Sequence, residues 1–122
     1  MAKSVHNDVI DDGLNVIKNN ANLMIACSAE PTTRTEAVTT YALADIAMVA
    51  GDFTIADGDV NGRKLTVAAK SGALVDASGD ATHIALVDAT RLLFVTTCTP
   101  QTLTAGNTVN YPAWDVEISD PT

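Results

Sequence analysis

Residues 82–97, THIALVDATRLLFVTT, carry the clearest structural signal in the sequence. Two runs of aliphatic and β-branched residues, 82–87 and 91–97, flank the polar segment 88–90. Runs of this kind favour extended strands, and a short polar segment between them favours a turn. The stretch therefore predicts a β-hairpin, and with it an antiparallel sheet into which the neighbouring segments must fit.

Short apolar runs bounded by turn residues continue on both sides of this hairpin. Strands are predicted at residues 23–28, 53–56, 64–69, 73–75 and 114–118, while 38–49 is compatible with a strand, a loop or a helical turn. Pro100 is expected to end the ladder of the hairpin, because proline lacks a backbone N–H. The number and spacing of these runs predict a mainly β fold, a small antiparallel β-sandwich or barrel.

One short amphipathic helix is predicted ahead of the strands, over residues 4–19, with Ser4 as its N-cap. Its apolar face comprises Val5, Val9, Ile10, Leu14 and Ile17. A helix of this length is marginal alone and needs a surface to pack against. We therefore expect helix and β-rich region, residues 22–119, to form a single domain covering residues 1–122.

The charge of the chain limits its partners. The formal net charge is −8, and the acidic residues are spread along the sequence. Nucleic-acid binding requires clustered lysine and arginine, so we expect no nucleic-acid partner. No apolar run is long enough to span a membrane, and the N-terminal residues lack the apolar core of a signal peptide, so we expect synthesis in the cytoplasm without ordinary secretion.

The segment 57–62, DGDVNG, resembles the first half of a calcium-binding loop. Asp57, Asp59 and Asn61 would supply oxygen ligands. The twelfth position, where a bidentate glutamate is expected, is Ala68. We therefore predict an ordinary β-turn and no metal or other cofactor, with a calcium site at these three residues as the weaker alternative.

The residues that could support catalysis are few. His6 and His83 are the histidines, and no G-x-S-x-G motif is present. Cys27 and Cys98 do not form a C-x-x-C pair and lie in apolar or threonine-rich strands, so we expect reduced, structural thiols. We predict that the protein is not an enzyme, and keep a small hydrolase as the least favoured alternative.

Surface anchors are predicted in two places. The first is the helix face of Val5, Val9 and Leu14. The second is the segment around Tyr111 and Trp114, since aromatic residues often anchor interfaces. The sequence favours equally the alternative that Trp114 is a core residue at the start of the last strand.

The order of several segments resembles the short virion proteins of tailed bacteriophages, a group that includes head-decoration and tail-fibre-like proteins. The resemblance lies in residues 41–44 (YALA), 81–89 (ATHIALVDA), 92–96 (LLFVT) and 101–109 (QTLTAGNTV). It implies a protein without an active site, present in many copies on a virion that assembles in the host cytoplasm.

On this basis the expected function is that of a capsid decoration, or cement, protein that binds the major capsid protein. We expect a homo-oligomer, with a trimer favoured. A tail or fibre component bound to a tail protein is the first alternative. A small calcium- or ligand-binding module is the second.

Overall fold

The structure of the protein, a computed structural model, describes residues 4–120, which form β-strands and a single N-terminal α-helix, as the sequence predicts. The elements are α1 (Asn7–Asn20), β1 (Leu23–Cys27), η1 (Glu36–Thr40), β2 (Ala42–Ala47), η2 (Ala50–Asp52), β3 (Phe53–Asp57), β4 (Arg63–Val67), β5 (Lys70–Leu74), β6 (Gly79–Val87), β7 (Leu92–Leu103), β8 (Thr108–Tyr111) and β9 (Trp114–Ile118). Here η1 is a π-helical turn and η2 a 3₁₀ turn.

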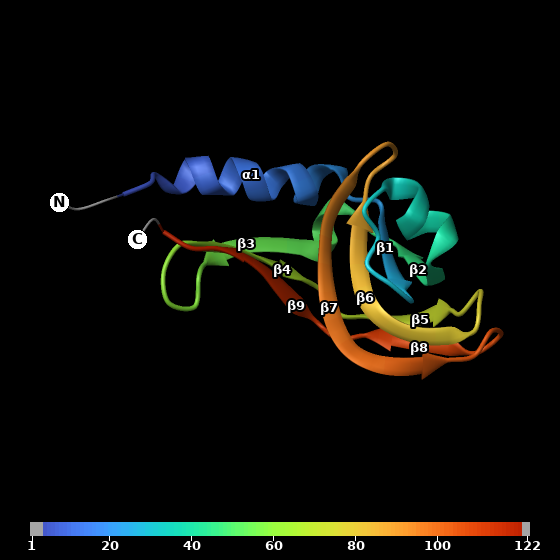
Figure 1. The fold of residues 1–122 in the computed structure, drawn as a ribbon. Helices are drawn as coiled ribbons and strands as arrows, with labels where there is room; N and C mark the ends of the chain where they lie inside the picture. Colours follow the sequence, from blue (N-terminus) through green and yellow to red (C-terminus); the bar gives the residue numbers. More distant parts are fainter. Residues whose placement is uncertain (1–3, 121–122) are drawn as a thin grey trace.

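The strands form antiparallel sheets that are not closed into a barrel, so the fold is sandwich-like (Figure 1). One sheet has the order β2-β1-β6-β7 and another the order β3-β4-β9, while β5 and β8 pair with each other. We call the first the four-stranded sheet and the second the three-stranded sheet. The central hairpin predicted from the sequence is present as β6 and β7.

A bent two-stranded ribbon connects the three-stranded sheet with the β5–β8 ladder. Val67 pairs with Trp114 where β4 meets β9, and Lys70 pairs with Tyr111 where β5 meets β8. These pairs belong to one continuous register, so β4–β5 and β9–β8 are two halves of the same ladder. The ribbon bends at residues 68–69 and 112–113, where Pro112 cannot donate to a ladder.

Helix α1 lies along the three-stranded sheet (Figure 1). Its buried side chains, Ile10, Leu14 and Ile17, belong to the same core cluster as Leu65 of β4. The helix begins at Asn7 and ends at Asn20, so the predicted N-cap at Ser4 is wrong. His6 occupies the cap position instead, because its Nδ1 accepts a hydrogen bond from the Asp8 amide at 3.1 Å.

Strand β7 is longer than predicted and passes through Pro100. Thr97 pairs with His83 and Gln101 pairs with Ala81, so three residues of β7 lie opposite one residue of β6. The expectation that Pro100 ends the ladder is therefore wrong. Since β7 is an edge strand, a bulge can absorb the proline without leaving a neighbouring strand unpaired.

The four-stranded sheet is buried on parts of both faces. One face contributes to the main core, and the other carries a second cluster that includes Ile25, Cys27 and Val87. The segment containing η1 packs over this second cluster through Ala37, which is fully buried. The ambiguous stretch 38–49 thus contains the end of this covering turn followed by the edge strand β2.

Candidate functional site

A long uncharged segment distinguishes one surface of this acidic protein. From residue 92 to residue 114 the chain contains no aspartate, glutamate, lysine, arginine or histidine, although its net charge is −8. This segment forms β7, β8 and the first residue of β9. This segment therefore adds no charged side chain to the surface, although Thr102 of β7 donates a hydrogen bond to Asp80, a charged residue of the neighbouring β6.

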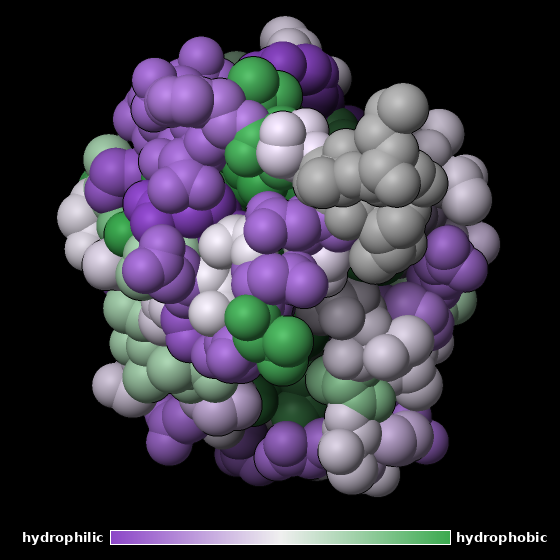
Figure 2. All heavy atoms as spheres, turned by 90° about the vertical axis from the view of Figure 1, so that its left-hand side faces the viewer, coloured by the Kyte–Doolittle hydropathy of each residue, from purple (hydrophilic) through white to green (hydrophobic). Residues whose placement is uncertain are grey.

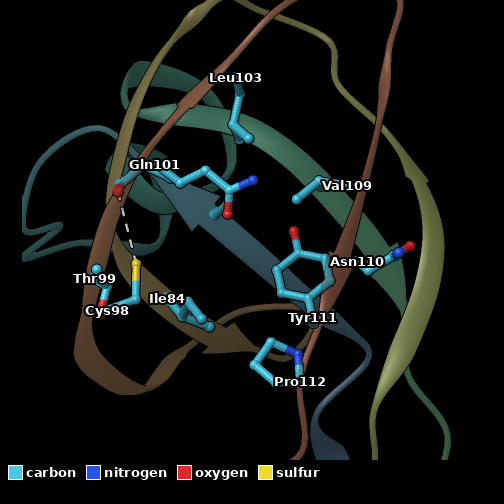
Figure 3. Close-up of a pocket in the computed structure, with 11 residues that line it drawn as sticks. Ile84, Cys98, Thr99, Gln101, Leu103, Val109, Asn110, Tyr111 and Pro112 are labelled. Carbon is cyan, nitrogen blue, oxygen red and sulfur yellow. Dashed lines mark hydrogen bonds between the residues drawn. The ribbon is translucent and has the colours of Figure 1, made fainter.

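A mostly apolar cleft of about 220 Å³ lies between β7 and β8 (Figure 3). Its lining residues are all uncharged: Ala26, Ala81, Ile84, Cys98, Thr99, Gln101, Leu103, Val109, Asn110, Tyr111 and Pro112. The alanines come from the central strands β1 and β6, where larger side chains would fill the space between the layers. The cleft is thus a consequence of the small side chains at these two core positions.

The two groups of the cleft that ionise most readily, the Tyr111 hydroxyl and the Cys98 thiol, have hydrogen-bond partners within the protein. The Tyr111 hydroxyl donates to the Ala44 carbonyl at 3.0 Å, and the Cys98 thiol donates to the Ala81 carbonyl at 3.7 Å. Burial raises the pKa of both groups, so both stay protonated at neutral pH. The cleft is therefore suited to hold an apolar group and offers neither a thiolate nor an acid–base pair.

An aromatic pair joins the two sheets beside the cleft. The rings of Phe94 in β7 and Trp114 in β9 stack with centroids 5.9 Å apart and planes at 28°. Both residues are partly exposed and pack against the main core. The Trp114 Nε1 atom is buried and has no hydrogen-bond partner among the residues that the structure describes, and an unsatisfied buried donor costs about 1–3 kcal/mol. Trp114 is thus partly exposed, as an interface anchor would be, and also packs against the core, which was the alternative considered from the sequence.

The structure separates the predicted anchors into exposed and buried residues. Val9 is 66% exposed and Val5 is partly buried against the core. Leu14 is 1% exposed and Tyr111 is 3% exposed, so these two are core residues and their assignment as surface anchors is wrong. The Tyr111 ring fills the interior because its hydroxyl finds a backbone acceptor there.

The predicted helix face was too wide. Ile10, Leu14 and Ile17 define a narrow stripe toward the sheet, and Val9 lies to one side of it in solvent. At this end of the molecule the surface is mostly hydrophilic, and its hydrophobic areas are separate from one another (Figure 2). Val9 is thus an isolated exposed side chain, which is common on protein surfaces.

In the 57–62 loop, one side-chain oxygen of each of Asp57, Asp59 and Asn61 accepts a bond, and each has a different donor. Arg63 donates to Asp57 at 2.6 Å, and Lys64 donates to Asp59 at 2.7 Å. Asn61 Oδ1 accepts the Asp120 amide at 3.1 Å. Between residues 4 and 120 no group of three or more His, Cys, Asp or Glu side chains is arranged to hold a metal ion. The loop is thus organised by the cations and amides of the protein itself.

Arg63 also connects this loop to the helix. Its Nε donates to Asp11 Oδ1 at 2.8 Å, and its guanidinium contacts both Asp11 and Asp57. The hydrogen bond to Asp11 and then that to Asp57 raise the pKa of Arg63 further above its usual range. The charged end of the three-stranded sheet is therefore tied to α1 by ion pairs.

The remaining titratable candidates have structural partners. His83 Nδ1 lies 2.9 Å from Thr82 Oγ1, in agreement with a hydrogen-bonded strand histidine. Cys27 and Cys98 are free thiols in the structure. Burial, with a smaller contribution from Cys98, raises the pKa of Cys27 to about 11, so its thiol is a poor nucleophile at neutral pH.

Asp88 is a buried carboxylate whose role the sequence analysis missed. It accepts hydrogen bonds from the Thr90 amide at 2.8 Å and from Arg91 Nε at 2.7 Å, which closes the turn between β6 and β7. The bond from the Thr90 amide is the main reason that the pKa of Asp88 is lowered. An aspartate at the start of a turn was the available signal, because it can bond the backbone two residues later.

No protein-family model, curated protein or solved structure matches the chain. Within the described residues, no helix is both long enough and apolar enough to cross a membrane.

Proposed function

We propose that the protein is a non-enzymatic structural component of a bacteriophage particle, a decoration protein that binds the major capsid protein on the outer head surface. The resemblance of the sequence to short virion proteins is the reason for proposing this class of protein. The observation that carries the proposal is the uncharged surface formed by β7 and β8, with its apolar cleft, on a molecule of net charge −8.

The cleft has the dimensions of a receptor for one side chain. A volume of about 220 Å³ lies below the range of roughly 300–1,000 Å³ that is usual for sites of drug-sized ligands. An aliphatic or aromatic side chain of the capsid protein would be desolvated there without meeting a charge. A domain of this size can offer about 800 Å² to one partner, and repeated contacts across a lattice reinforce one another.

The test uses charges placed on the rim of the cleft. Thr99 and Gln101 are exposed, so Thr99→Asp and Gln101→Asp should fold normally but bind particles less, because each puts a charge where the partner must be desolvated. Thr54→Asp, at an exposed position on β3, is the matched control and should bind fully. Circular dichroism and melting curves check folding, and mass spectrometry of purified particles gives occupancy.

Removal of the protein provides the second part of the test. Particles lacking it should form but rupture at a lower temperature or under milder osmotic shock. Equal robustness of depleted and complete particles would overturn the cement function. A copy number of a few per particle would then favour the tail or fibre alternative.

The ligand-binding alternative rests on the same cleft. A small apolar molecule such as indole would raise the melting temperature if the cleft were its site, because ligands that bind only the folded state stabilise it. A rise that is abolished by Ala81→Leu, which fills the cleft from its base, would favour this alternative over a protein partner.

A further inference from the structure

Among residues 4–120, no strand pairs with the outer edge of β7. The four-stranded sheet ends at β7, whose hydrogen-bonded neighbour on its other side is β6. Unpaired backbone groups along an edge are a template for another strand, and proteins usually protect them with charges, prolines, bulges or covering segments. The sheet edges of this protein differ in how they are protected.

The other edges of these sheets are protected. On β2, the Leu43 carbonyl accepts the amides of Asp76 and Ala77 at 2.7 and 3.2 Å, and Asp45 is exposed. On β3, Lys18 Nζ donates to the Phe53 carbonyl at 2.7 Å. β9 carries the exposed acidic residues of its sequence WDVEI, and β8 is only four residues long.

The two halves of β7 differ. Beyond Thr97 the strand contains the bulge and Pro100, both of which discourage pairing. The first half, residues 92–97, consists of uncharged, mostly β-branched or aromatic residues. It has a smaller bulge at Leu93, but its register with β6 is regular from Phe94 to Thr97, and these four residues offer the straight part of the edge. Side chains of these types fit cross-strand pairs well.

We propose that the edge of β7 at residues 92–97 pairs antiparallel with the same edge of a second copy of this chain. The two four-stranded sheets then become one continuous sheet across a two-fold axis. This inference names a self-association surface and does not depend on the proposed function in the particle.

Charge is the reason to choose a second copy as the occupant. Two molecules of net charge −8 repel one another, and they can approach most closely where neither carries fixed charge. The β7 edge is such a place on both partners at once. Charged side chains border this edge at Arg91, which directly precedes it, and at Glu30, which lines a shallow hollow beside Val95 and Thr97. Added salt should screen the repulsion that remains between the two acidic molecules and strengthen the association.

The symmetry of the contact sets the number of copies. Antiparallel pairing of identical strands uses the same surface on both molecules, so it closes at two and leaves no β7 edge free. The trimer favoured from sequence requires a different contact. The mass of the assembly therefore separates the two possibilities directly.

The experiment is sedimentation velocity on the purified protein over a range of concentrations and at low and high salt. We expect a monomer–dimer equilibrium that shifts toward dimer with salt. Thr97→Lys puts like charges on the two edges and should weaken the dimer about tenfold or more. Thr54→Lys, which makes the same change at an exposed position on β3, should leave it unchanged.

Cross-linking locates the contact independently of stability. In a Cys98→Ser background, cysteine is placed in turn at Val95, Thr96 and Thr97, and the protein is oxidised. A covalent dimer should form chiefly at the position nearest the two-fold axis. A monomer at all soluble concentrations, a trimer, a dimer that is equally sensitive to Thr97→Lys and Thr54→Lys, or a dimer without cross-links at these positions would each overturn the proposal. Because no particle is needed, failure here is distinguishable from failure of the proposed function.

Discussion

The three-stranded sheet and the four-stranded sheet differ in the charge that they carry at their ends. Under α1, the three-stranded sheet ends in ion pairs that join Arg63 to Asp11 and Asp57 and Lys64 to Asp59. The four-stranded sheet ends in β7, which carries no charge over its whole length. The difference places fixed charge on the three-stranded sheet and none on β7, the edge strand that we propose as a contact surface.

The largest expected effect concerns the contact between α1 and the three-stranded sheet. Leu14→Ala should lower the free energy of unfolding by about 3 kcal/mol, because it leaves a cavity in the core. Val9→Ala, on the same helix but exposed, should change it by less than about 0.5 kcal/mol. Chemical denaturation measures both. Similar losses for the two variants would mean that α1 packs through a different face.

The next effect concerns Trp114, where the two sheets meet. Trp114→Ala should cost about 2 kcal/mol, less than for a fully buried tryptophan because the ring is partly exposed. Trp114→Phe should cost far less, since it keeps a ring against Phe94 and removes a buried N–H that lacks a partner.

Denaturant titrations of both Trp114 variants give this comparison. If Trp114→Phe is as destabilising as Trp114→Ala, the indole N–H has a partner in solution. Reduced particle binding by Trp114→Ala alone would not identify an interface, because the substitution also disturbs the core.

Acid should destabilise the protein partly through the turn at Asp88. The pKa of this carboxyl is lower in the folded than in the unfolded chain, so its contribution to stability is complete above the unfolded value of about 3.9 and is lost as the pH falls toward the folded value. Asp88→Asn should flatten this acid limb of the stability curve.

Melting temperatures between pH 6 and pH 2 would show the change in slope, with Asp12→Asn, an exposed position on α1, as the control. An acid limb of unchanged slope in Asp88→Asn would show that other carboxyls, such as Asp52 with its lowered pKa, dominate the acid response.

The smallest expected effect is that of calcium on the loop of residues 57–62. One side-chain oxygen of each of Asp57, Asp59 and Asn61 is already bound, to Arg63, Lys64 and the Asp120 amide respectively, so calcium would compete with partners within the protein. We expect the same melting temperature in calcium and in chelator. A rise of several degrees with calcium would reverse this prediction, because a ligand of the folded state must stabilise it.

Much of the fold could be predicted from local patterns. The alternation at residues 114–118 and the apolar runs around residue 88 correspond to β9 and the β6–β7 hairpin. The passage of β7 through Pro100 could not be predicted, since proline is tolerated there only because β7 lies at an edge. The edge position depends on the order of strands distant in sequence.

Less of the candidate site than of the fold could be predicted from the sequence. Tyr111 and Trp114 attract attention as aromatics, but the acceptor that keeps Tyr111 inside, the Ala44 carbonyl, belongs to a strand distant in sequence. The cleft similarly depends on alanines from two other strands. The lack of charged residues from 92 to 114 can be read from the sequence. Only the structure shows that one strand of this segment, β7, lies at the edge of a sheet.

The bent ribbon has a consequence for the order in which the chain folds. Strands β8 and β9 leave the ribosome after every other described strand, yet they pair with β5 and β4. The β6–β7 hairpin and the β3–β4 hairpin are local and can form early, whereas the ribbon requires pairing between residues about 35 to 55 positions apart, which is slow. A nascent chain would thus expose the core face of the four-stranded sheet before its second layer is complete, and in that interval a chaperone or slow translation would have the most influence on the yield of folded protein.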